Sequence, residues 1–168
     1  MKKNLSFLIA FVGIGMLFSG CGAKPYVDTK SDDYATFQLV PKSETLIFTD
    51  DYYAYITDFS KGCHKDEFLG VIKTDSDTPS RVAKIPAGKP LIIKANYTIT
   101  SNNSTYTEYD LFLLTPEKHK DYVVEYVRKD VSLFKTVSDF YVYEKDGNKE
   151  VEIPKSRIRN FDYERECN

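Results

Sequence analysis

An alternation of apolar and polar side chains over residues 90–99 constrains the fold of this chain more than any other feature. This period of two is typical of a strand with one face buried and one face turned to solvent. We therefore expect a half-buried strand here. In "PLIIKANYTI" the predicted inner face carries Leu91, Ile93, Ala95, Tyr97 and Ile99, and the outer face carries Ile92, Lys94, Asn96 and Thr98.

Further short runs of the same kind indicate an all-β fold. Turn signals such as "SNNS" at 101–104 and the Asp146-Gly147 pair separate them, and 13 Tyr and 11 Phe favour strands. We expect an immunoglobulin-like two-sheet antiparallel β-sandwich, with a small β-barrel as the alternative. The other predicted strands cover 34–40, 45–49, 52–57, 105–114 and 122–127, and two more alternating runs within 139–154 flank the Asp146-Gly147 turn.

The first twenty residues have the layout of a secretory signal peptide. Lys2 and Lys3 precede an apolar segment over 5–18, which is too short to span hydrocarbon about 30 Å thick. Small residues then precede Cys21. We expect a signal peptide over 1–20, a polar flexible tether over 21–33 and a sandwich domain over 34–168.

The sequence Phe18-Ser19-Gly20-Cys21 resembles the lipobox of bacterial lipoproteins. In that class the cysteine becomes the first mature residue and carries fatty chains such as palmitate. The resemblance implies lipidation at Cys21 and a lasting membrane attachment, since several chains hold far better than one. The residue after the cysteine is Gly22 rather than an aspartate, which in such lipoproteins implies transfer to the outer membrane. The resemblance therefore implies a protein of the cell envelope that is attached to the outer membrane and faces the periplasm.

The charge of the mature chain argues against nucleic acid as a partner. Cleavage before Cys21 would leave 148 of the 168 residues, with 21 basic residues against 25 acidic ones and a formal charge of −4. Binding to phosphates requires a basic face. The length suits one domain with its own core.

Two cysteines remain once Cys21 is assigned to lipidation. In an oxidising compartment we expect Cys63 and Cys167 to form a disulfide, with two unbridged thiols as the alternative. Such a bond would enclose about a hundred residues and contribute roughly 4–5 kcal/mol in the chain-entropy model.

The chain has no G-x-S-x-G or H-E-x-x-H sequence. We expect no enzymatic activity, no cofactor and no metal ion. A lipid-anchored hydrolase that uses scattered carboxylates, such as Asp58 and Glu67, is the alternative from a different class.

Tyrosines provide the one candidate binding surface. They could line a face that binds sugar or peptide, or pack in the core with their hydroxyls at its rim. The leading hypothesis is a non-catalytic binding or structural module that meets another envelope protein, and the alternative is an accessory subunit of a secretion or surface assembly. The candidate face comprises Tyr52, Tyr53, Tyr55, Tyr106 and Tyr109.

Three segments within residues 81–168 resemble a group of uncharacterised small proteobacterial lipoproteins. The segments are "RVAKIPAGKPLIIKANY", "LLTPEKHKDYVVEY" and "FYVYEKDGNKEVEIPKSRI", followed by a terminal cysteine. Their shared features are turns, such as the one that contains Pro86 and Gly88. The resemblance implies an envelope location and carries no activity with it.

Overall fold

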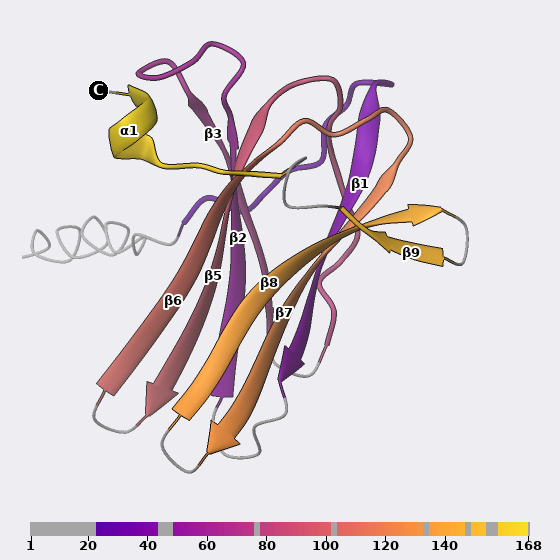
Figure 1. Cartoon of the computed structure of the whole chain (residues 1–168). Helices are drawn as coiled ribbons and strands as arrows, with labels where there is room; N and C mark the ends of the chain where they lie inside the picture. The colour runs from indigo at the N-terminus through magenta and orange to yellow at the C-terminus, as the bar shows by residue number, and fades with distance from the viewer. Residues whose placement is uncertain are drawn as a thin grey trace, which may run out of the picture.

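The chain folds as two β-sheets packed face to face in the computed structural model (Figure 1). The structure describes residues 23–43, 49–75, 78–101, 104–132, 135–146, 149–153 and 158–167. The predicted β-sandwich is therefore confirmed, and the sheets do not close into the small barrel of the alternative. The first sheet has the order β4 (Ala83–Pro86), β1 (Tyr34–Ser43), β7 (Asp121–Ser132), β8 (Lys135–Asp146) and β9 (Lys149–Glu152). The second has the order β10 (Arg159–Asn160), β6 (Ser104–Leu114), β5 (Leu91–Ser101), β2 (Thr49–Asp58) and β3 (Glu67–Asp75).

Strand pairing is antiparallel with one exception among the described strands. The predicted hairpins pair as expected, with Ser101 opposite Ser104 between β5 and β6, and Asp146 opposite Lys149 between β8 and β9. Strands β1 and β7 instead run parallel. Parallel neighbours need a long connection, and here the connection between β1 and β7 contains β4 and four strands of the second sheet, β2, β3, β5 and β6. The predicted strand over 45–49 lies almost entirely outside the described residues.

Four aromatic rings from both sheets occupy the centre of the core. Tyr97 stacks on Tyr126 with ring centroids 4.6 Å apart, and Tyr52 contacts both of these rings at 5.1 and 5.3 Å. Phe140 lies 4.7 Å from Tyr126. Such ring pairs add about 0.5–1.5 kcal/mol each to the free energy of area burial. The inner face of β5 is as predicted, because Leu91, Ile93, Ala95 and Tyr97 are fully buried.

The segment predicted to be a flexible tether is packed on the domain, so that prediction is wrong for residues 24–29. Pro25 bridges Val71 of β3, and backbone hydrogen bonds of 2.9 Å flank this bridge on both sides. Tyr26 is 6% exposed, and its hydroxyl donates a hydrogen bond of 2.9 Å to the carbonyl of Lys84. The segment is mostly polar, so nothing in the sequence indicated that Tyr26 would be buried against the domain. We call residues 24–29 the docked segment.

Gly70 of β3 makes this docking possible. Its φ is +146°, and a Cβ atom at this position would lie 2.6 Å from the Cα of Tyr26 and 2.8 Å from the carbonyl oxygen of Pro25. Contacts this close require a residue without a side chain. Burial, followed by the charge of Asp28, raises the pKa of the Tyr26 hydroxyl well above its ordinary value, so this group remains a donor.

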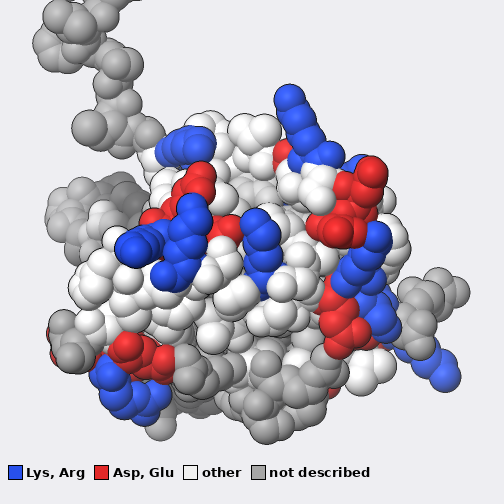
Figure 2. All heavy atoms as spheres, turned by 90° about the horizontal axis from the view of Figure 1, so that it is seen from above, with Lys and Arg blue, Asp and Glu red and all other residues white. Residues whose placement is uncertain are grey.

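Charges of both signs alternate over one end of the sandwich. Figure 2 shows blue and red side chains interleaved on the end that lies uppermost in Figure 1. Ion pairs account for part of this mixing, including Lys120 with Glu144 at 2.7 Å and Lys118 with Asp33. The visible end therefore offers no large patch of a single sign to an anionic surface.

Candidate functional site

A hollow of about 400 Å³ lies on the outer face of the second sheet, the face turned away from the core. Its centre is set by strand register, since Lys94 of β5 lies between Tyr55 of β2 and Leu111 of β6. Directly paired residues point to the same face, so their side chains converge. We call this site the aromatic hollow. It is lined by Tyr55, Thr57, Asp66, Phe68, Ile92, Lys94, Tyr109, Leu111 and Tyr163.

Aromatic rings reach the hollow from four different elements. Tyr55 of β2 and Phe68 of β3 form a tilted pair with centroids 6.4 Å apart. Tyr109 of β6 is 63% exposed, which is unusual for a ring that has a sheet face available for packing. Tyr163 belongs to α1 (Tyr163–Cys167). Exposed rings collected around one concavity are typical of binding surfaces.

The disulfide places the fourth ring. Cys63 and Cys167 are bonded, as predicted, and their Cα atoms lie 5.4 Å apart. The bond ties α1 to the loop between β2 and β3, where Asp66 accepts a hydrogen bond of 2.8 Å from the Tyr163 hydroxyl. This hydrogen bond, together with local burial and the Asp66 charge, raises the pKa of Tyr163. The C-terminal helix is therefore part of the site.

Lys94 places a positive charge inside the hollow. Its Nζ lies 4.5 Å from the centroid of the Tyr109 ring, a cation–π arrangement. Lys73, on the same face of the sheet, is different because it pairs with Asp51 at 3.0 Å. No such ion pair forms between Lys94 and any carboxylate of the described part of the chain.

The predicted tyrosine face is only partly assembled. Tyr53, Tyr55 and Tyr109 do lie on the outer face, although Tyr53 is outside the hollow and donates a hydrogen bond of 3.0 Å to Asp51. Burial, together with this hydrogen bond, raises the pKa of Tyr53. The prediction is wrong for Tyr52. Successive residues of a strand point to opposite faces, so Tyr52 points away from the face that carries Tyr53, and its side chain is fully buried in the core. The side chain of Tyr106 lies outside the described part.

Of the nine residues that line the hollow, two were predicted from the sequence to belong to a site, Tyr55 and Tyr109. Phe68 lies on a strand that the alternation did not predict. Lys94 was assigned to the correct outer face but not to a site. Tyr163 had one available signal, since it is four residues before Cys167 and a disulfide to Cys63 carries it toward β2.

The carboxylates of the hydrolase alternative lie elsewhere. Asp58 and Glu67 are opposite each other at the ends of β2 and β3, and neither lines the hollow. Burial alone would raise the pKa of Asp58, but hydrogen bonds from Ser60 and the Lys89 ammonium 3.5 Å away together hold it below its ordinary value. Asp58 therefore acts as an ionised turn and ion-pair residue.

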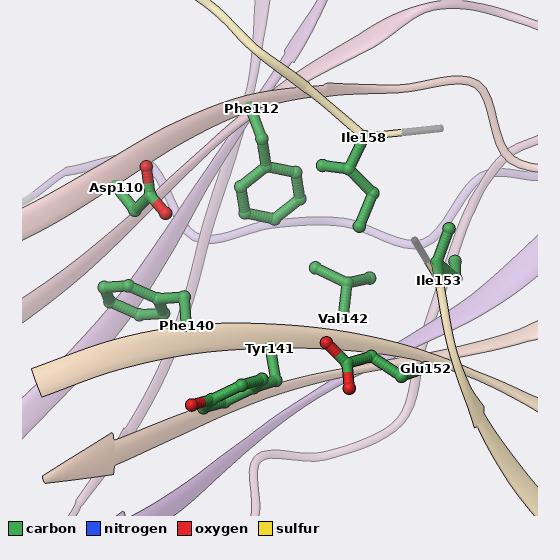
Figure 3. Close-up of a pocket in the computed structure, with 8 residues that line it drawn as sticks. All are labelled: Asp110, Phe112, Phe140, Tyr141, Val142, Glu152, Ile153 and Ile158. Atoms are coloured by element: carbon green, nitrogen blue, oxygen red, sulfur yellow. The ribbon is translucent and has the colours of Figure 1, made fainter. Parts of the chain in front are cut away.

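A second, smaller cavity opens between the sheets near β6, β8 and β9. Figure 3 shows Phe112 and Ile158 facing Val142 across it, with the carboxyl groups of Asp110 and Glu152 at its sides. Its volume is about 50 Å³. That is room for a few water molecules and not for an organic ligand.

No helix in the described ranges is long and apolar enough to cross a membrane. Within the same ranges, no three His, Cys, Asp or Glu side chains are grouped so that they could hold a metal ion. Cys21, the predicted lipidation site, precedes the first described residue.

Comparisons with known proteins add no relative. The chain matches no protein-family model, no curated protein and no solved structure at a significant level. The class of the protein is therefore defined by its fold, a two-sheet β-sandwich with a disulfide-linked C-terminus and an aromatic hollow on one face.

Proposed function

We propose that this protein is a lipid-anchored binding protein of the bacterial cell envelope. In this proposal the lipid is carried by Cys21, and the aromatic hollow engages another envelope component without catalysing a reaction. The observation that carries the binding role is the hollow itself. It gathers four exposed or half-exposed rings around about 400 Å³, within the range of about 300–1,000 Å³ that is typical of ligand sites.

The docked segment supports a close attachment to the bilayer. Pro25, the residue that bridges β3, lies four residue steps after Cys21. Fully extended, they reach at most about 14 Å. The domain would therefore lie directly beside the lipid headgroups. Because the charges visible in Figure 2 are mixed in sign, the lipid rather than surface charge would attach the domain to the membrane.

The anchor makes a direct prediction for Cys21→Ser. Cells fed an alkynyl fatty acid should label the wild-type protein, and the serine variant should lose at least nine-tenths of the label because it has no thiol to acylate. The measurement is fluorescence of the clicked product after affinity purification. A variant in which Cys63 and Cys167 are both serine is the matched control and should keep its label. An intact leader or an unmodified Cys21 thiol in the native product, detected by mass spectrometry, would overturn the anchor.

The binding role predicts a contact at Tyr109 in living cells. A benzophenone amino acid in place of Tyr109 should form a photo-crosslinked product, because its ring borders the hollow and inserts into C–H bonds of any nearby molecule. The product should fall at least fivefold when Phe68→Ala is added. Tyr141, a half-exposed ring of the other sheet, is the matched control position and should give no such product. Equal yields from positions 109 and 141 would contradict the proposed site.

A further inference from the structure

We infer that the aromatic hollow binds a saccharide that carries a carboxylate. This inference rests on the proposed function and names the ligand class of the same site. It follows from where the hollow lies in the sheet, from the chemistry of its walls and from Lys94, the one cation among its described lining residues.

The position of the hollow disfavours an extended peptide. Strands β2 and β5 each pair with a neighbour on both sides, so their backbone N–H and C=O groups are used within the sheet. A peptide that adds to a sheet needs a free strand edge for its own backbone. A ligand that lies over β2 and β5 at the centre of the hollow is therefore held there by side chains.

The walls suit a sugar ring. The apolar C–H face of a pyranose can pack on an aromatic ring, and Tyr55, Phe68, Tyr109 and Tyr163 each offer one. Sugar hydroxyls need hydrogen-bond partners close to these rings. Asp66 and the tyrosine hydroxyls provide them at the rim. A simple acyl chain would leave these polar groups without a use.

Lys94 selects the charge of the ligand. Its ammonium lies in the hollow over the Tyr109 ring and has no carboxylate partner in the described part of the chain. A cationic ligand would meet like charge there. A single carboxylate on the ligand would complete an ion pair beside an aromatic surface, where water is partly excluded and the pairing is stronger than in bulk solvent.

The test uses the full acylated protein in detergent. The probes are oligosaccharides of glucuronic acid, galacturonic acid and N-acetylmuramic acid, each with a neutral counterpart in which the carboxyl group is reduced to an alcohol. Binding is measured by surface plasmon resonance on the immobilised protein. At least one acidic oligosaccharide should bind tenfold more tightly than its neutral counterpart.

Three variants separate the contributions. Lys94→Gln should remove the preference for the acidic probe while leaving the weaker affinity for the neutral one. Tyr109→Ala should weaken both affinities at least tenfold. Tyr141→Ala, on the opposite sheet, should change neither.

The outcomes also separate this inference from the proposed function. If no probe binds better to the wild type than to Tyr109→Ala, or if neutral and acidic probes bind equally, the saccharide inference is overturned. A crosslinked product at position 109 would in that case still support a binding role with another partner. Loss of both signals would overturn the proposed function as well.

Discussion

Replacement of both Cys63 and Cys167 by serine is expected to lower the free energy of unfolding by about 4 kcal/mol. The disulfide spans 104 residues, so its loss greatly increases the conformational freedom of the unfolded chain. The variant should also lose the ordered position of Tyr163, because α1 has only five residues and none of them is buried. Urea denaturation followed by circular dichroism measures the first effect, and affinity for the acidic oligosaccharide probes measures the second.

Reduction of the wild-type protein provides the control for this prediction. A strong thiol reductant should shift the wild-type urea midpoint to that of the double variant and should leave the variant unchanged. Tyr163→Phe separates the ring from its hydroxyl, since it removes only the hydrogen bond to Asp66. A wild-type midpoint that does not respond to complete reduction would show that the bond does not stabilise the fold.

Gly70→Ala is expected to destabilise the protein by about 3 kcal/mol or more, the sum of backbone strain at positive φ and the exposure of Tyr26. The added methyl group would overlap the backbone of Pro25 and Tyr26, which has no flexible side-chain end to move aside. The docked segment should therefore detach from β3. Trypsin should then cleave after Lys24 and Lys30 at least tenfold faster than in the wild type, as measured by mass spectrometry.

Gly62→Ala is the matched control for this substitution. Gly62 also has a positive φ, of +74°, but no atom lies within 4 Å of a Cβ built there. Its replacement should cost about 1 kcal/mol from backbone strain alone and leave residues 24–29 protected. Equal destabilisation by Gly70→Ala and Gly62→Ala would show that the close approach of Gly70 to the docked segment does not contribute to the stability of the fold.

The sequence allowed most of the sandwich to be predicted, because its half-buried strands alternate. The run over 90–99 was placed on the correct faces wherever the side chains are described. Strand β3 was missed because both of its faces are covered near Gly70, so Gly70, Val71 and Ile72 are buried in succession and the alternation disappears. Strand β4 has only four residues, which is too few for a periodic signal.

The candidate site was less accessible to prediction, because it depends on contacts between distant residues. Tyr55 and Tyr109 were identified, but their meeting requires the register of β2, β5 and β6. Tyr52 was placed on the wrong face because three tyrosines in four residues were treated as one cluster, whereas successive strand residues alternate. Phe68 and Tyr163 join the site only through β3 pairing and the disulfide.

The docked segment has a mechanical consequence. Val71 pairs with Pro25 on one side and with Tyr55 on the other, so it links the chain that leads to Cys21 with the strand that borders the hollow. Under the proposed function, tension between the membrane and a bound ligand would travel sideways through neighbouring strands of a single sheet. The ring cluster between the sheets would bear little of that load, and the sandwich could resist pulling without being opened.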